Sequence, residues 1–427
     1  MLLTLITVLF FALALAGIPL VYALLLTTVG TIWARGLTHP LETIFLTYIG
    51  GVEPFILIAV PLFIVSGELL SRGGVGKRIV RFAQSLFGFL TGGLGIVTVT
   101  ASALFGGVSG SAIADTAAIG SVMIPALLER GYSRAFAGAL LSASGTLAVI
   151  IPPSIPLLVF GFVSGASVRD LFLSGVVPGL VFGLGMVGVC VRYSKRTGID
   201  AGRAVADRQE VWKAFKSAFP ALVMPLIILG GIWTGFFTPT EAAAVATIYG
   251  LLVAIFVYRD LRWRDVPAIL LHSFTTSAVV MVVIGATAAV AWLITVEQVP
   301  MMLIEAVRPY MTSRWAFLFI ANVAMLLLGI FIEPLPAMLL STPILIPLAN
   351  AFQIDLVHLG LITTANLAIG LYTPPVGGTL FLAAKLANAG IGEVSRELIP
   401  FFVVVIAVLF LVTYIPVLPM GLVWLFR

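Results

Sequence analysis

Long apolar runs recur from one end of this chain to the other, and residues 401–415 and 221–234 are the cores of two of them. A helix needs about 20 mostly apolar residues to cross roughly 30 Å of hydrocarbon, and runs of this kind are typical of membrane spans. Only 10% of the residues are charged and 61% are hydrophobic, whereas soluble domains carry roughly 25% charged residues. The pattern predicts an all-α polytopic membrane protein and excludes an ordinary soluble fold.

The N-terminal 33 residues have two interpretations. They lack the basic start and the small-residue cleavage site of a secretory signal, so we expect them to remain as membrane-crossing structure. The Gly17-Ile18-Pro19 break divides them into two short crossings, and the alternative is one long tilted helix. The expected number of crossings is therefore ten or eleven.

The basic residues gather in short segments between the apolar runs. Arg72 and Lys77 belong to the first cluster, and Arg130 and Arg134 form the second. Basic loops stay in the cytoplasm, so the net charge of +5 reflects topology and not nucleic-acid binding. The longest polar segment, residues 192–218, is interpreted as a cytoplasmic linker and topology anchor between a first repeat (1–191) and a second repeat (219–427).

Between the first two basic clusters lie two short apolar arms, residues 94–105 and 117–128, separated by the polar sequence GGVSGSAIADT. Either both arms cross the membrane fully, or they form a re-entrant hairpin over about residues 90–129. The arms are short for full crossings, and a tip rich in Gly and Ser suits backbone that packs against protein or water. These features favour the hairpin.

A broken helix follows the hairpin, over about residues 135–165. Its apolar sequence is interrupted by PPSIP, and a Pro-Pro pair cannot propagate a helix because it removes two N–H donors and clashes with the preceding turn. We therefore expect one span that is interrupted in its middle.

The second half repeats this order at an offset of 222 residues, which is the separation of Pro125 and Pro347. An apolar hairpin with a polar tip (about 315–350) again precedes a helix broken at Pro-Pro (about 357–384). The further prolines that the offset superposes are Pro152 and Pro153 on Pro374 and Pro375, and Pro178 on Pro400. A shared period of this kind indicates an internal repeat.

The charges at the ends of the two hairpins predict that the repeats have inverted topology. The first hairpin ends in the basic sequence ERGYSR, whereas the second ends in ANAFQIDLVHLG, which has no Lys or Arg. The second hairpin should therefore open to the opposite side of the membrane. Arg308 and Arg314 disagree with this assignment, which places them outside, and the pattern of the whole chain outweighs them.

Two tips (106–115 and 331–336) and two breaks (151–156 and 373–378) are expected to meet in the middle of the bilayer. The positive ends of interrupted helices favour anionic groups, and freed carbonyls and hydroxyls can replace the hydration shell of a small cation. The oxygen-rich surroundings predict a site for Na⁺ or another hard ion. The candidate Na⁺ ligands are Ser109, Gly110, Ser111, Ser142, Gly145, Thr146, Pro152, Thr364, Asn366, Gly370 and Thr373. The candidate substrate-binding residues are Ser109, Ser111, Asp115, Ser154, Glu333, Pro374 and Thr379.

Each of these candidates has a purely structural alternative. A hydroxyl can simply bond to the backbone of its own helix. Asp115 and Glu333 are acids at the tips, where an ionisable residue indicates function, but Asp115 could instead cap the second arm of its hairpin. The remaining titratable candidates are Glu68, Glu241 and Glu297, interpreted as interfacial, and His39, His272 and His358, whose scatter supports neither a metal triad nor a proton relay.

No catalytic signature appears in the sequence. GxxxxGK[ST], GxSxG and HExxH are all absent, so ATP hydrolysis and those hydrolase reactions are unsupported. An intramembrane hydrolase would need a His or Lys beside a tip serine or two facing aspartates, and the tips contain serines and a single aspartate, Asp115, with no such base nearby. The single cysteine, Cys190, excludes an intrachain disulfide. We therefore do not expect an enzyme.

Several motifs together resemble the large membrane (DctM-like) subunit of the tripartite ATP-independent periplasmic (TRAP) transporters, over essentially the whole chain. They are GGVSGSAIADTAAIGSVMIPALLERGY, IIPPSIPLLVFG, LFLSGVVPGL, FFTPTEAAAVA and LYTPPVGG. The resemblance implies an elevator fold like that of the ion-transporter superfamily, in the bacterial inner membrane. It also implies symport of a carboxylate, such as a C4-dicarboxylate, a sialic acid or a 2-oxo acid, with Na⁺. By this match, Ser109, Gly110, Ser111 and Asp115 fall at the first tip, Pro152, Pro153 and Ser154 at the first break, and Pro374, Pro375, Gly377 and Gly378 at the second break.

The same resemblance implies two partners, a soluble periplasmic substrate-binding protein and a small four-helix membrane subunit. Because the chain begins directly with its first span, the small subunit is expected to be a separate polypeptide. The alternative is a stand-alone ion-coupled anion permease that needs no binding protein. Neither tip contains an Arg that would mark a carboxylate clamp, so the sequence does not name the solute.

Overall fold

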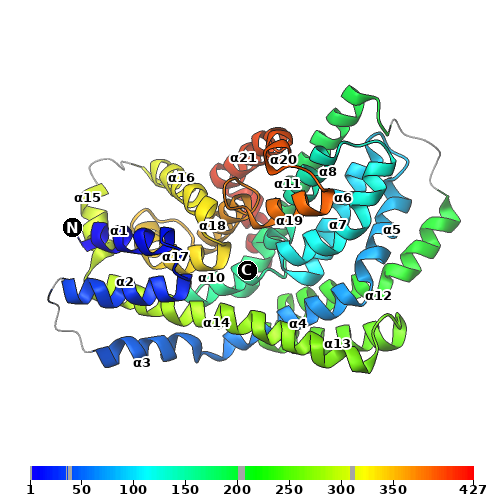
Figure 1. Ribbon diagram of the computed structural model, residues 1–427. Helices are drawn as coiled ribbons and strands as arrows, with labels where there is room; N and C mark the ends of the chain where they lie inside the picture. The colour runs from blue at the N-terminus through cyan, green and yellow to red at the C-terminus, as the bar shows by residue number, and fades with distance from the viewer. Residues whose placement is uncertain (1, 35, 37–40, 201–206, 308–312) are drawn as a thin grey trace.

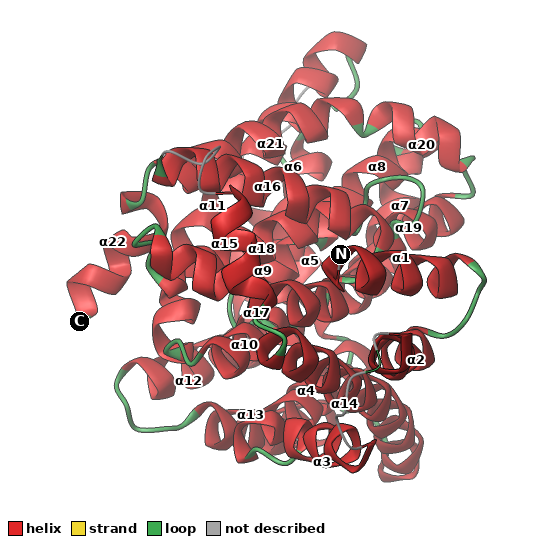
Figure 2. Ribbon diagram, turned by 90° about the vertical axis from the view of Figure 1, so that its left-hand side faces the viewer, coloured by secondary structure: helices red, strands yellow, loops and turns green. Residues whose placement is uncertain are grey.

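The computed structural model describes residues 2–34, 36, 41–200, 207–307 and 313–427, and every regular element in these ranges is a helix (Figure 2). In this part of the chain nine helices are long and apolar enough to cross a membrane. A tenth span results if α20 (Ile391–Glu397) and α21 (Ile399–Tyr414), which are bent by 50°, are counted as one. The prediction of an all-α polytopic protein is confirmed.

The N-terminal segment forms two helices, so the alternative of one long tilted helix is wrong. Helix α1 (Leu2–Leu15) and helix α2 (Leu20–Ala34) pack against each other (Figure 1). Gly17 turns the chain between them with a φ of 80°, which favours glycine, and Pro19 lacks the N–H that would continue a helix. At about 1.5 Å per residue, the 14 residues of α1 span only about 21 Å, less than the hydrocarbon core. Ten or eleven crossings therefore remain a prediction.

One layer of the molecule forms around a long helix, α14, and we call it the support layer (Figure 1). Helices α2, α3 and α4 lie along α14, and α13 lies on α4. Small residues allow the close approach, since an added Cβ on Gly51 of α3 would lie 2.4 Å from the Cβ of Ala288. The support layer consists of α1, α2, α3 (Leu41–Val52), α4 (Ala59–Arg72), α13 (Pro239–Leu252) and α14 (Val266–Val296).

A second group of helices, which we call the bundle, lies above this layer in Figure 1. Its first part comprises α6 (Gly93–Ser109), α7 (Ala112–Glu129), α8 (Arg134–Gly145), α9 (Leu147–Ile150), α10 (Ile155–Ser164) and α11 (Val168–Thr197). Its second part comprises α16 (Arg314–Phe331), α17 (Pro334–Ala351), α18 (Leu356–Gly370), α19 (Gly378–Ala387), α20 and α21. Helices α5 (Val75–Phe87), α12 (Arg208–Trp233), α15 (Val299–Val307) and α22 (Val417–Phe426) join or flank the two groups, as do the short turns η1 (Phe55–Ile58), η2 (Val253–Val257) and η3 (Trp263–Asp265).

The two parts of the bundle exchange neighbours. Helices α7 and α17 begin at positions separated by the 222-residue offset, and so do α8 and α18. Helix α19 packs against α7 and α8 of the first part, while α10 packs against α17 and α18 of the second. In each part, the second half of the interrupted helix (α10 or α19) thus packs against two helices of the other part.

Helices occupy both ends of the polar segment 192–218. Helix α11 continues to Thr197 and α12 begins at Arg208, so both helices extend into the range interpreted as linker. Lys, Arg and Glu are good helix formers, and they continue each helix beyond its apolar part. The connection itself spans residues 198–207, of which Arg203 lies outside the described residues.

Asp200 ties this connection to the bundle. Its side chain is only 2% exposed, and it accepts hydrogen bonds from Leu94 N (2.8 Å), the Tyr132 hydroxyl (3.2 Å) and Arg130 Nη1 (3.3 Å). Burial raises the pKa of Tyr132, so its hydroxyl remains a donor. The carboxylate therefore holds the start of α6 and the α7–α8 loop beside the end of α11.

The α7–α8 loop and the α17–α18 loop lie at opposite ends of α11. The α7–α8 loop reaches its C-terminal end, where Tyr132 stacks on Tyr193 at 5.8 Å between ring centroids. The α17–α18 loop reaches its N-terminal end, because Arg427 bonds to both Asp170 of α11 (2.9 Å) and Asp355 before α18 (3.3 Å). At about 1.5 Å per residue, the 30 residues of α11 separate these loops by about 45 Å.

Candidate functional site

The first tip, between α6 and α7, lies directly on the first break. Helix α6 ends at Ser109 and is followed by its C-cap Gly110, whose φ of 61° favours glycine. Ser111 is the N-cap of α7, and its side chain accepts a hydrogen bond from Ala114 N (3.4 Å). An added Cβ on Gly110 would lie 2.8 Å from the carbonyl oxygen of Pro153, and one on Gly106 would lie 2.6 Å from Ala148 Cα. Glycine is therefore what allows the backbone of the tip to contact the break.

The first break separates α9 from α10 as the Pro-Pro pair predicts. The Pro152–Pro153 peptide bond is cis. Ser154 bridges the two half-helices, because its hydroxyl donates to the carbonyl of Val149 at 2.5 Å and accepts from Leu157 N at 3.3 Å. One side chain thus closes the end of α9 and caps the start of α10.

The second tip and the second break repeat this contact. Helix α16 ends at Phe331, and an added Cβ on Gly370, the last residue of α18, would lie 2.3 Å from the carbonyl oxygen of Gly329. Within the break the Pro374–Pro375 bond is cis, and the Thr379 hydroxyl donates to the carbonyl of Leu371 at 3.0 Å.

One cavity of about 120 Å³ lies where these elements meet. It is lined by the first two residues of three helices: Ala112 and Ile113 of α7, Ile155 and Pro156 of α10, and Pro334 and Leu335 of α17. Gly110, Ser111, Glu333, Val149 and Leu371 complete the lining. Three helix N-termini, each with the partial positive charge of its helix dipole, therefore converge on the same small space.

The predicted site residues divide between this cavity and the helices around it. Gly110, Ser111 and Glu333 line the cavity, whereas Pro374 and Thr379 do not. Ser142 of α8 and Thr379 of α19 are joined by a hydrogen bond of 3.3 Å between their hydroxyls, which connects the two interrupted helices. Gly145 provides room for α7, since an added Cβ would lie 2.2 Å from Thr116 Oγ1.

Asp115 lies one turn into α7 and is completely buried. Neither of its carboxylate oxygens lies in good hydrogen-bonding geometry with a described residue, and the side chain that interacts with it more weakly is that of Ser102. The cap of α7 is Ser111, so the structure does not show the alternative in which Asp115 caps the helix. Glu333, the acid at the other tip, is exposed and makes no side-chain cap.

Several candidate hydroxyls bond to their own helices, as the structural alternative expects. Thr146 donates to Ala143 O (2.7 Å), Thr364 to Gly360 O (2.8 Å) and Thr373 to Ile369 O (2.7 Å). Each hydroxyl oxygen keeps lone pairs, so these bonds leave the oxygens able to accept or to coordinate. Ser109 lies at the tip and accepts from Ser111 N at 3.4 Å.

Asn366 belongs to a buried polar network whose other members the sequence analysis missed. Its amide donates to Asn322 Oδ1 (2.6 Å) and to Ile362 O (2.8 Å), and Asn322 donates to Thr413 Oγ1 (3.1 Å). Asn322 could have been identified as a polar residue inside an apolar span. The network connects α16, α18 and α21.

The other titratable candidates are dispersed. Glu68 pairs with Arg72 at 2.6 Å, and Glu241 forms a capping box with Thr238. His358 is buried with Nε2 3.1 Å from the carbonyl of Val412, His272 is exposed, and His39 lies outside the described residues. Across the described ranges no group of three or more His, Cys, Asp or Glu residues could hold a metal ion.

Spanning helices, interrupted helices and converging helix ends around one small cavity are the features of a membrane transport protein. Residues 7–418 match the family model described as "Tripartite ATP-independent periplasmic transporter, DctM component". The chain belongs to this family.

Relatives of known name agree with this assignment. The chain is 36% identical to the C4-dicarboxylate TRAP transporter large permease protein DctM of Rhodobacter capsulatus, over 96% of each chain. It is 38% identical to the sialic acid TRAP transporter large permease protein SiaM of Vibrio cholerae, over 86% of each. The isethionate TRAP transporter permease protein DctMQ of Oleidesulfovibrio alaskensis is 38% identical over 96% of this chain, which spans only 65% of that longer protein. The relatives are transporter permease subunits, so this chain is a transporter subunit and not an enzyme.

Proposed function

We propose that this chain is the large membrane subunit of a Na⁺-coupled secondary transporter for an organic anion of the carboxylate class. It works in the bacterial inner membrane with a small four-helix membrane subunit and a periplasmic binding protein that delivers the substrate. The observation that carries the proposal is the convergence of the N-termini of α7, α10 and α17 on one cavity. Helix N-termini attract anionic groups, and a carboxylate is such a group.

Asp115 supports coupling to a cation. A buried carboxylate without a partner is costly, because burial removes water and nothing supplies the opposite charge. A hard cation such as Na⁺ is coordinated by oxygen atoms and would pair this charge. In this proposal, Asp115 and the hydroxyls and carbonyls of the tips and breaks bind the cation, and the helix N-termini bind the anionic substrate. The site therefore favours binding of Na⁺ and substrate at the same time.

We further propose that α6–α7 and α16–α17 are re-entrant hairpins of two inverted repeats. The equal offsets of the helix starts, the exchange of neighbours between the two parts and the loops at opposite ends of α11 all support this. Inverted repeats give two similar halves facing opposite sides, which is the basis of alternating access in many secondary transporters.

Uptake into proteoliposomes tests the coupling. The vesicles contain this chain and the small subunit, and the binding protein loaded with substrate is added outside. We expect accumulation with an inward Na⁺ gradient and none with an equal K⁺ gradient. Equal uptake without a Na⁺ gradient would contradict the coupling, and uptake by this chain alone would indicate the stand-alone permease.

A disulfide across the two groups of helices tests the proposed elevator movement. Gly67 of α4 faces the first tip, since an added Cβ would lie 3.0 Å from Ser109 O and 3.2 Å from Ser109 Cα. In a Cys190→Ser background, oxidation of Gly67→Cys with Ser109→Cys should lower transport to below about a tenth, because the bundle is then held on the support layer. A reductant should restore the rate to that of Ser109→Cys alone. If the cross-linked protein transports as fast as the protein treated with reductant, this sliding movement is excluded.

A further inference from the structure

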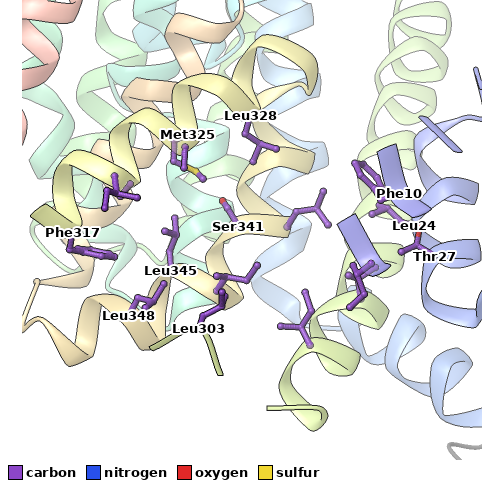
Figure 3. Close-up of a pocket in the computed structure, with 18 residues that line it drawn as sticks. Phe10, Leu24, Thr27, Leu303, Phe317, Met325, Leu328, Ser341, Leu345 and Leu348 are labelled. Atoms are coloured by element: carbon purple, nitrogen blue, oxygen red, sulfur yellow. The ribbon is translucent and has the colours of Figure 1, made fainter. Parts of the chain in front are cut away.

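An apolar cavity of about 440 Å³ lies between the support layer and the second part of the bundle (Figure 3). Phe10 and Leu24, from α1 and α2, lie on one side of it, with residues of α14. Phe317 and Leu345, from α16 and α17, lie on the other. Its walls therefore come from two groups of helices that are distant in sequence.

The lining offers water no free side-chain hydrogen-bond donor and at most two side-chain hydroxyl oxygens as acceptors. Among the residues that line it, only Thr27 and Ser341 have side-chain hydroxyls. Thr27 donates to Ala23 O at 2.6 Å, and Ser341 to Met338 O at 3.2 Å. A water in a cavity needs two to four polar partners, and at about 30 Å³ per water this volume equals that of about fifteen waters. The cavity suits apolar matter and is far larger than the packing defects of protein interiors.

The mouth of the cavity opens along α16. Ile320 and Ala324 line the cavity and are also exposed, and they lie four residues apart on one face of the helix. Because α16 is long and apolar enough to cross the membrane, this mouth opens into hydrocarbon. A spanning helix of a partner, about 10–12 Å wide and about 30 Å long, is several times larger than the space. An unbranched acyl chain, one methylene wide, is narrow enough to enter.

We propose that this cavity is a binding site for one acyl chain of a membrane phospholipid, whose headgroup stays outside the mouth. The chain fills the apolar space between the two groups of helices. If the bundle slides on the support layer, which rests on the proposed function, the two walls separate, so the bound chain stabilises the arrangement described here. Binding of the chain itself depends only on the cavity.

Photolabelling tests this proposal. The full chain is reconstituted in phosphatidylethanolamine and phosphatidylglycerol vesicles that contain a phospholipid with a diazirine in the middle of one acyl chain. After irradiation, the labelled residues are mapped by mass spectrometry. We expect label on the cavity residues Met325 and Leu345, and loss of that label in Ala324→Trp, which fills the mouth, and in Ser341→Leu, which narrows the cavity from α17.

Leu327→Trp is the matched control, since Leu327 is 55% exposed on the same helix and does not line the cavity. This variant should keep the cavity label. Label in the cavity that persists in both filling variants would overturn the proposal, as would wild-type label confined to the outer face around Leu327. Elution of each variant as a single species shows that it has folded. Na⁺-driven uptake is measured in a separate experiment, so a failure of the acyl-chain proposal can be distinguished from a failure of the proposed transport function.

Discussion

Replacement of Asp115 by Asn lowers Na⁺-driven uptake to about a tenth or less of the wild-type rate, a loss of about 1.4 kcal/mol or more. The substitution keeps the shape of the side chain but removes the charge that the proposed cation pairs. The buried carboxylate has no hydrogen bond of good geometry among the described residues, so its neutral replacement disrupts no strong contact there. The measurement is the initial rate of uptake in proteoliposomes, together with its dependence on Na⁺ concentration.

Glu129→Gln is the control for this experiment, because Glu129 is an exposed acid at the other end of the same helix. It makes the same change of charge and should leave uptake near the wild-type rate. An Asp115→Asn protein that transports like Glu129→Gln, with unchanged Na⁺ dependence, would remove Asp115 from the site.

Gly110→Ala is expected to abolish most transport by separating the first tip from the first break. An alanine in the left-handed conformation costs about 1–2 kcal/mol, and its Cβ would lie 2.8 Å from Pro153 O. Because real Cβ atoms do not approach carbonyl oxygens so closely, the tip has to move away and the cavity loses its shape. The rate of uptake should fall below about a tenth, since a small displacement of a binding group has large effects.

Gly165→Ala is the control that separates the steric clash of Gly110→Ala from the free-energy cost of an alanine in the left-handed conformation. Gly165 is likewise a helix C-cap, after α10, with a φ of 71°, and no atom lies within 4 Å of an added Cβ. Both variants should lose a similar thermal stability in detergent, but Gly165→Ala should keep nearly normal uptake. Equal uptake in the two variants would show that the contact between tip and break is unimportant for function.

Sequence alone predicts those parts of the fold that depend on local chemistry. Consecutive prolines interrupt a helix wherever they occur, so the break at Pro152 and Pro153 can be predicted from the sequence. The Gly-rich tip can be predicted for a similar reason, because glycine readily adopts the left-handed φ that Gly110 has at the turn. The apolar runs then identify which segments can lie in lipid.

Features that depend on packing between distant segments were not predictable. Val149 and Leu371 line the candidate site, but as apolar residues in apolar helices they carry no distinguishing signal. Asp200 lies in the polar segment 192–218, where its sequence surroundings do not distinguish it, and only the fold brings it to Leu94 and Tyr132. The apolar cavity also has no sequence signature, because its two walls are brought together by tertiary structure.

Cysteine accessibility tests the central claim, that two oppositely oriented hairpins form the site, most directly. In a Cys190→Ser background, single cysteines replace Gly131 in the α7–α8 loop and Gln353 in the α17–α18 loop. A membrane-impermeant maleimide is applied to right-side-out spheroplasts and to inside-out vesicles. The account predicts that Gly131→Cys reacts only from the cytoplasmic face and Gln353→Cys only from the periplasmic face. Labelling of both cysteines from one and the same face would contradict it.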